Sequence, residues 1–456
     1  MNNGTEIRFS DGTAGRIETF RSERLREAYM RVLHPSGLWI YVFPKELTTT
    51  SVLYATHFGS ADAAFTVEGD RCETVLPMGC AHFLEHKMFE QPDGSDAFAL
   101  FSALGADANA YTSWDKTAYL FQATENVYEA LEILLRFVSS PHFTEASVKK
   151  EQGIIAEEIR MNDDSPSERC FVNGLRAMYA HNAVRNEICG TEASIARITP
   201  EVLYTCYRTF YRPQNMALVL CGPVEIETVT AIVDRVLSSL PEDMKTPRTV
   251  LRRDENAKET RAVHRSRVNE RMQVGKPMFS VMVKDHDAVS LSPKERMRRD
   301  AGMMLLKELF FSTSSDLYLR LLDDGLISPH FSAGYGATSL YAFFEIAGES
   351  DDPDAVLREI RSELSAAMEH GIEEEAFLRA KRVLYAKTVK TFDGTRTVSE
   401  MLLDFVLSDY DLFEYVDLFE TLTREDAQAL LAEVFTDEAF AISIVSPLHE
   451  AEEENP

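Results

Sequence analysis

Apolar and polar positions in the first half of the chain follow two different periods. Short runs rich in β-branched and aromatic residues predict strands, and apolar residues three and four positions apart predict amphipathic helices. Strands are expected at 38–43, 51–58, 107–112, 117–123 and 216–221. Helices are expected at 95–104, 126–139 and 144–162. Alternation of this kind indicates sheets covered by helices.

The second half of the chain repeats the same mixture. Strands are expected at 279–283 and 439–446, a hairpin or strand pair within 331–348, and helices within 293–324 and 357–387. The similar length and element order of the halves predict an α+β protein of two homologous domains, each with a mostly antiparallel sheet packed against helices. We expect an N-terminal domain at 1–240, a proline-containing linker at 241–258, a C-terminal domain at 259–447 and an acidic tail at 448–456.

Composition narrows the classes of partner. The 456 residues are 45% hydrophobic and 27% charged, and the formal net charge is −27. This charge argues against nucleic acid and anionic membranes as partners. A solvated acidic surface explains it better than an acidic cavity for basic peptides. Neither a membrane-spanning run nor an N-terminal signal-peptide core is visible, so we expect a cytoplasmic protein.

The segment His82-Phe83-Leu84-Glu85-His86 carries the strongest chemical signal. It has the H-x-x-E-H order of a zinc-peptidase helix. Residues four apart share a helix face, so His82 and His86 can both present a nitrogen to one metal ion. Glu85 can reach a water molecule on that ion as a general base without being a ligand. Chance occurrence on a packed helix is the competing interpretation.

A catalytic zinc ion usually takes three protein ligands, so a third is needed. The helix predicted at 144–162 carries several glutamates, of which Glu151 and Glu158 are seven apart and share a face within about 20°. Glu157 points about 100° away from Glu158. One of the two carboxylates on the shared face can bind the metal while the other supports it.

The six cysteines contain no C-x-x-C pair, so they suggest neither a zinc ribbon nor a redox motif. Cys80 lies two residues before His82. A small core residue explains it better than a further ligand does.

Four segments together resemble one family, the pitrilysin/insulinase zinc metallopeptidases. The similar segments are residues 79–89 around the histidines, 104–112 (L-G-A-D-A-N-A-Y-T), 150–159 with its glutamates, and 211–216 (Y-R-P-Q-N-M). Their order and spacing agree with the family over most of residues 30–225. The length resembles the short branch of mitochondrial-processing-peptidase and bacterial type.

The resemblance implies a role for each matching position. His82, His86 and Glu158 would bind Zn²⁺, Glu85 would be the general base, and Glu151 would support the site. Ala108, Asn109 and Ala110 would lie on an edge strand to which an extended peptide substrate adds by main-chain hydrogen bonds. The cellular metal, zinc rather than manganese or cobalt, stays open.

The resemblance also implies two chains that pair as a clamshell around a chamber. Family members usually carry an Arg and a Tyr seven residues apart in the second domain. Here Arg320 is out of register, and Ile327 or Ser328 stands where Tyr is expected. Tyr335 is a substitute that nothing in the sequence supports. The simplest hypothesis is a heterodimer in which a homologous partner chain brings the Arg/Tyr pair, and a homodimer is the alternative.

We therefore expect a zinc-dependent endopeptidase that cleaves short or unfolded peptides, with leader-peptide processing as one option. The alternative is a non-catalytic peptide-binding or scaffold subunit of a heterodimeric peptidase.

Overall fold

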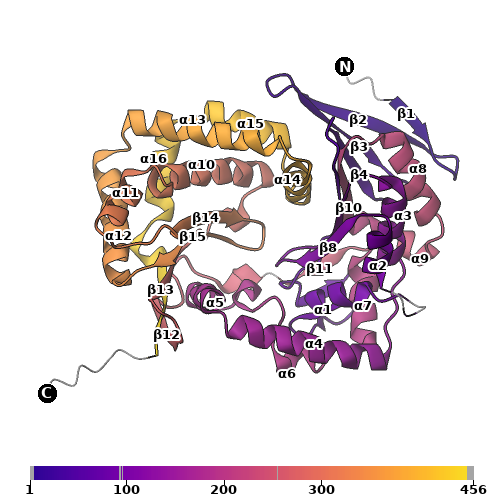
Figure 1. Cartoon of the computed structure of the whole chain (residues 1–456), viewed down its shortest axis with the longest axis horizontal. Helices are drawn as coiled ribbons and strands as arrows, with labels where there is room; N and C mark the ends of the chain where they lie inside the picture. The colour runs from indigo at the N-terminus through magenta and orange to yellow at the C-terminus, as the bar shows by residue number, and fades with distance from the viewer. Residues whose placement is uncertain (1–4, 92–93, 95, 254, 449–456) are drawn as a thin grey trace. The chain divides into compact units, whose positions relative to one another are not determined.

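The computed structural model describes residues 5–91, 94, 96–253 and 255–448. Within them the chain forms two compact units. Unit 1 comprises three segments: the residues up to Ile159, Glu187–Arg253 and Val389–Phe413. Unit 2 comprises Arg160–Asn186, the described residues from 255 to 388, and those from Glu414 onward. Figure 1 shows the elements of both units.

Unit 1 is built on a mixed sheet of eight strands, counted over the described residues, in the order β1-β2-β3-β4-β10-β5-β9-β8. Only β4 and β10 run parallel, and the other neighbours are antiparallel. Every residue of the central strands β5 and β10 is buried, which explains their nearly continuous apolar sequences. The strands are β1 (Thr5–Arg8), β2 (Ala14–Ser22), β3 (Glu27–Leu33), β4 (Trp39–Pro44), β5 (Thr50–Thr56), β8 (Asp107–Thr112), β9 (Thr117–Ala123) and β10 (Met216–Gly222), with β6 (Ala64–Val67), β7 (Thr74–Val75) and β11 (Val250–Arg252) in a small second sheet.

Helices of unit 1 pack their apolar faces into a core shared with this sheet. On α3, the predicted face of Leu131, Leu134, Leu135 and Val138 is buried as expected. The helices are α1 (Cys80–Met88), α2 (Ala97–Ala103), α3 (Val127–Val138), α4 (Glu145–Asp163), α6 (Glu192–Ile195), α7 (Pro200–Phe210), α8 (Ile226–Leu237), α9 (Glu242–Lys245) and α14 (Thr395–Leu407). Helix α4 passes from unit 1 into unit 2 after Ile159.

Unit 2 repeats the topology of the larger sheet. Its sheet has the order β12-β16-β13-β15-β14, with β12 and β16 parallel and the other neighbours antiparallel. This matches β4-β10-β5-β9-β8 strand for strand, which confirms an α+β fold of two related domains. The elements are α5 (Pro166–Met178), β12 (Arg267–Met272), β13 (Met278–Lys284), α10 (Pro293–Phe311), α11 (Asp316–Asp323), β14 (Ser332–Ala337), β15 (Ala342–Glu349), α12 (Pro353–His370), α13 (Glu374–Thr391), α15 (Leu412–Thr421), α16 (Arg424–Val434) and β16 (Phe440–Pro447).

The units exchange one helix each, so they differ from the contiguous domains expected at 1–240 and 259–447. Helix α14, from the second half of the chain, belongs to unit 1, where the Ser399 hydroxyl donates to Ser51 Oγ of β5 at 2.8 Å. Helix α5, from the first half, belongs to unit 2, where the Cys170 thiol contacts the Ser443 carbonyl of β16. Periodicity identifies the apolar face of a helix but not the sheet that covers it.

The segment expected to be a linker at 241–258 also differs in part. It contains α9, and β11 pairs antiparallel with β6, so its first part is built into unit 1. All of the predicted tail after Leu448 lies outside the described residues.

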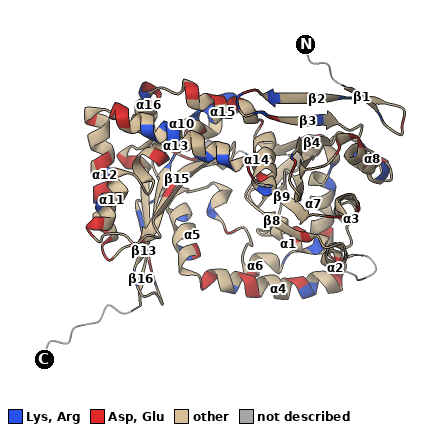
Figure 2. Ribbon diagram, turned by 45° about the horizontal axis from the view of Figure 1, so that its top comes forward, with Lys and Arg blue, Asp and Glu red and all other residues tan. Residues whose placement is uncertain are grey.

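The distribution of charge and the length of apolar helices concern the partners expected from the composition, nucleic acid and membranes. Figure 2 marks the acidic residues in red along the ribbon, and they occur on several helices, α4 and α12 among them. No helix in the described part of the chain is long and apolar enough to cross a membrane.

Candidate metal centre

Helix α1 carries the H-x-x-E-H segment and begins at a sharp turn. Gly79, its N-cap, has φ +90°, a left-handed conformation that glycine adopts without strain. A β-carbon on Gly79 would lie 2.4 Å from the Cys189 carbonyl oxygen. The first residue of the helix is therefore held against the loop that precedes α6. His82 and Glu85 are each only 8% exposed.

Three predicted metal ligands converge. His82 Nε2 lies 3.4 Å from Glu158 Oε1, and His86 Nε2 lies 3.6 Å from Glu158 Oε2. One ligand atom from each of the three residues falls within 4.8 Å of the others. Helix α1 supplies the two imidazoles, and α4 supplies the carboxylate.

The donor set fits a zinc ion. Zinc binds histidine nitrogen and carboxylate oxygen at about 2.0–2.2 Å, so two such donors in a tetrahedron are about 3.4 Å apart. The two nitrogen–oxygen separations at Glu158 agree with this value. His86 Nδ1 lies 3.0 Å from Glu151 Oε1, and a carboxylate can only accept, so Nδ1 carries the proton. This leaves the lone pair of His86 Nε2 directed at the cluster.

Glu151 contacts His86, as the expected supporting carboxylate would. Its side chain is 13% exposed, and it contacts the ring nitrogen of His86 that faces away from Glu158. Burial acts to lower the pKa of His86, but the hydrogen bond with Glu151 and the neighbouring carboxylates outweigh burial and raise it. For Glu158 the hydrogen bond with His82 is the main cause of a lowered pKa. The exposed Glu157 takes no part in the cluster.

Glu85 lies beside the cluster but is not among its three donors. The Thr112 hydroxyl, at the end of β8, donates to Glu85 Oε2 at 2.6 Å and fixes the carboxylate. Burial raises the pKa of Glu85, and the Thr112 hydrogen bond opposes that shift. A fixed carboxylate with raised proton affinity is suited to accept a proton.

Strand β8 forms one edge of the eight-stranded sheet, with β9 as its only neighbour in the described sheet. It carries Ala108, Asn109 and Ala110, the predicted substrate-binding residues. The Asn109 side chain accepts from the Ala110 backbone N–H at 2.8 Å. The strand that ends at Thr112 therefore joins an open sheet edge to Glu85.

The residues considered for an Arg/Tyr pair make contacts within unit 2. Arg320 pairs with Glu363 at 2.8 Å, and Ile327 is buried. The Tyr335 hydroxyl donates to Asp285 Oδ2 at 2.7 Å, and Asp285 also binds Arg299. These contacts tie Tyr335 to a buried ionic network.

Two residues of the site carry no signal of their role in the sequence. Thr112 stands out only as part of a family-like segment, and its hydrogen bond to Glu85 depends on β8 lying beside α1. Cys189 lies 3.9 Å from His82 Nε2 and 3.8 Å from Glu158 Oε1, and no motif marks it.

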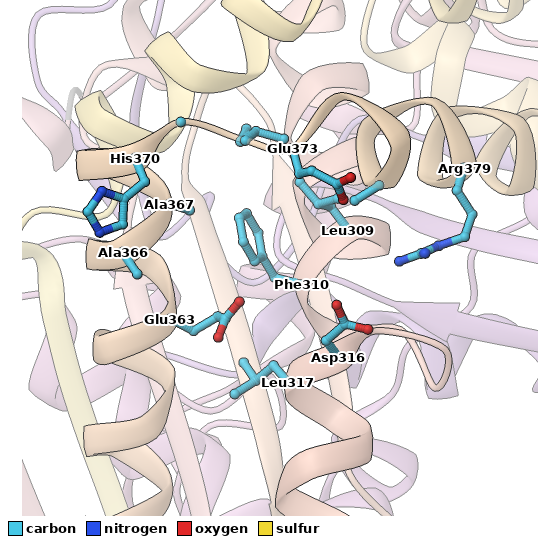
Figure 3. A pocket seen from close by; sticks show the side chains of 13 residues that line it. Leu309, Phe310, Asp316, Leu317, Glu363, Ala366, Ala367, His370, Glu373 and Arg379 are labelled. Atoms are coloured by element: carbon cyan, nitrogen blue, oxygen red, sulfur yellow. The ribbon is translucent and has the colours of Figure 1, made fainter.

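A cavity of about 260 Å³ in unit 2 does not belong to this site. Figure 3 shows its lining, with Asp316 on α11, Glu363 and His370 on α12, and Arg379 on α13. None of these side chains belongs to the metal cluster, which unit 1 alone supplies.

Comparison with known proteins places the chain in a family. The family described as Insulinase (Peptidase family M16) matches residues 60–192, and the Peptidase M16 inactive domain matches residues 197–384. The protein named uncharacterized zinc protease YmfH of Bacillus subtilis is 36% identical over 432 residues, covering 94% of this chain and 99% of that protein. The probable mitochondrial-processing peptidase subunit beta of Arabidopsis thaliana is 23% identical over 85% of this chain and 74% of its own length.

Solved structures agree with the sequence comparison. The M16-like peptidase structure from Alicyclobacillus acidocaldarius has a TM-score of 0.86 and 32% identity, covering 95% of this chain and 98% of that one. A Helicobacter pylori protease structure, with a TM-score of 0.77 and 17% identity, shares the fold. This chain belongs to the insulinase family of peptidases, family M16.

Proposed function

We propose that this chain is a zinc-dependent endopeptidase that cleaves short or unfolded peptides. The observation that carries the proposal is the convergence of His82, His86 and Glu158 with Glu85 directly beside them. A structural cluster would not need a buried carboxylate that is left out of the ligand set. Relatives named zinc proteases support the reaction class.

The bound zinc ion would polarise the scissile carbonyl and make a water molecule acidic enough to attack it near neutral pH. Glu85 accepts the proton of the attacking water and delivers it to the leaving amine. Thr112 holds the Glu85 carboxylate in place during this transfer. Glu151 keeps His86 in the tautomer whose Nε2 binds the metal.

The open edge at β8 is the proposed binding place for the peptide main chain. An extended substrate adds to a sheet edge through its own backbone N–H and C=O groups, so recognition depends little on side chains. Ala108, Asn109 and Ala110 provide the edge, and Thr112 links the same strand to Glu85. This mode favours substrates whose main chain is accessible. Leader peptides and short peptides in general both meet this requirement.

A homologous partner chain that brings an Arg/Tyr pair completes the proposal. In this chain Arg320 pairs with Glu363 at the surface, and the Tyr335 hydroxyl donates to Asp285 in a buried ionic network, so the two do not form a pair with each other. The same observation favours a second candidate function, a peptide-binding subunit without activity of its own. The intact donor set and Glu85 favour the enzyme.

The test is hydrolysis of a mixed library of quenched fluorescent peptides by the zinc-loaded chain. Replacement of Glu85 by Gln should lower turnover by about 10²- to 10⁴-fold, because proton transfer is lost. Glu157→Gln, an exposed position on α4, is the matched control and should retain activity. Undiminished hydrolysis by the Glu85 variant would exclude Glu85 as the base. A zinc-loaded wild-type chain that cleaves only after a homologous partner is added would support the heterodimer.

A further inference from the structure

Cys189 adds a sulfur atom to the nitrogen and oxygen donors of the metal centre. Its Sγ lies 3.9 Å from His82 Nε2 and 3.8 Å from Glu158 Oε1, and these two atoms lie 3.4 Å from each other. The thiol is half-buried. It therefore adjoins two atoms that would themselves bind the ion.

The backbone around Cys189 is held by close contacts with the backbone at the start of α1. Its carbonyl oxygen would meet any β-carbon on Gly79 at 2.4 Å, and a β-carbon on Gly190 would meet the Met78 carbonyl at 2.6 Å. The Ser194 hydroxyl donates to that same Met78 carbonyl at 2.8 Å. These contacts fix the 189–190 backbone against the start of α1, two residues before His82.

Two of the Cys189 distances, to His82 and Glu158, are close to those between ligands of one ion, while Cys189 lies outside the group of His82, His86 and Glu158 atoms that are all within 4.8 Å of one another. Zinc binds sulfur at about 2.3 Å and nitrogen or oxygen at about 2.0–2.2 Å, so a tetrahedral pair of sulfur and nitrogen is about 3.6 Å apart. The observed separations of 3.9 and 3.8 Å exceed this value by about 0.2–0.3 Å. The Cys189 thiol donates a hydrogen bond to Glu158 Oε1, and a bound ion would take the place of that proton.

We propose that Cys189 is a fourth protein ligand of the resting metal centre, giving a His₂-Glu-Cys donor set. The inference rests on the proposed zinc site and deepens it. On binding, the sulfur coordinates as thiolate and its proton passes to solvent. Sulfur would then fill the position that a catalytic zinc site usually leaves for water, so before hydrolysis a water molecule would have to replace the thiolate, which would take back a proton from solvent.

A sulfur donor also changes which metal the centre prefers. Soft thiolate ligands favour zinc and cobalt over manganese, whereas oxygen and nitrogen donors discriminate less. The chain is thereby selective for thiophilic ions. A His₂-Glu set without Cys189 loses part of that selectivity.

The test loads the metal-free protein with Co²⁺ and records its absorption spectrum together with the bound cobalt per chain. Wild type should show a sulfur-to-cobalt charge-transfer band in the near ultraviolet. Cys189→Ala should bind cobalt without the band, with Cys189→Ser as the second variant if the alanine variant does not fold. Cys72→Ala removes an exposed thiol and should keep the band.

Four results would overturn the inference in distinguishable ways. Wild type with one cobalt bound but no band would exclude a sulfur ligand while leaving the zinc site intact. A band that persists in Cys189→Ala would assign the sulfur to another residue. Wild type that binds no cobalt would overturn the proposed metal site itself. In competition titrations, Cys189→Ala should lose at least about tenfold of the preference for Zn²⁺ over Mn²⁺. An equal loss for both metals would contradict the sulfur ligand.

Discussion

Removal of Glu151 tests whether the contact with His86 sets metal affinity. The Glu151 carboxylate lies 3.0 Å from His86 Nδ1 and is largely shielded from solvent. Glu151→Ala deletes the acceptor, so the ring is free to rotate and to exchange its tautomers. Glu151→Gln keeps an amide oxygen at the same place but removes the charge.

The expected loss follows from this geometry. Groups that orient a ligating histidine typically contribute 10- to 100-fold in metal affinity, or about 1.4–2.7 kcal/mol. A charge-assisted hydrogen bond is about twice as strong as a neutral one, so Glu151→Gln should lie near the lower limit and Glu151→Ala near the upper one. Both variants keep every proposed ligand, so both should still bind one zinc ion at saturation.

The assay is a competition titration of Zn²⁺ against a fluorescent chelator at constant pH. Glu157→Gln, on the same helix and exposed, is the control for a general change in charge and should bind zinc as wild type does. A dissociation constant for Glu151→Ala within about twofold of wild type would refute the orienting role. So would an equal loss in the Glu157 variant, because it would attribute the effect to helix charge.

Two further predictions concern stability. Burial raises the pKa of Asp300 from its ordinary 3.8 to about 6, so the folded state keeps a proton that the unfolded chain releases. Stability from the neutral carboxyl is present below pH 3.8 and lost as the pH rises through 6, by about 3 kcal/mol. In urea unfolding, the free energy of unfolding of Asp300→Asn should therefore exceed that of wild type by about 2–3 kcal/mol near pH 8 and by little near pH 4. Asp417→Asn, at an exposed position, is the control and should show no such pH-dependent gain. A gain for Asp300→Asn that does not depend on pH would contradict the assignment. Gly79→Ala should lower the free energy of unfolding by at least about 1–2 kcal/mol, because Gly79 has a left-handed backbone and the new β-carbon would clash with the Cys189 carbonyl oxygen. Gly153→Ala, in open space on α4, should instead gain up to about 1 kcal/mol, and equal effects at both glycines would sink the reasoning.

Local sequence patterns are sufficient to predict most elements of the core. The apolar runs of β5 and β10 and the face of α3 are visible because burial imposes a composition on each element separately. The shared element order of the halves correctly indicates two related domains, since the five strands of the unit 2 sheet follow the same order as β4-β10-β5-β9-β8 of unit 1. Periodicity predicts no strand in residues 5–33, where β2 and β3 are mostly half-exposed and polar residues interrupt the apolar ones.

The exchange of α5 and α14 between units could not be predicted from periodicity. Both helices have an apolar stripe, and either sheet could bury it. Only tertiary contacts, such as that between Ser399 and Ser51, assign the helix to its sheet.

The candidate site is predictable where its residues are close in sequence. His82, Glu85 and His86 lie on one helix, so their spacing alone places them together. The pairing of Glu158 and Glu151 with the two histidines is implied by resemblance, and the structure brings these residues into contact. Thr112 and Cys189 lie 27 and 107 positions from their partners, so spacing gives no signal for them.

The most direct test of the account is the zinc content of the purified chain and its site variants, measured by mass spectrometry alongside peptide hydrolysis. We expect one zinc ion per chain in wild type and in Glu85→Gln, with hydrolysis by the variant about 10²- to 10⁴-fold slower because the base is lost. His82→Ala and Glu158→Gln should lose the metal. Full zinc content in those two variants, or hydrolysis by a zinc-free wild-type chain, would contradict the assignment of His82, His86 and Glu158 as the metal centre.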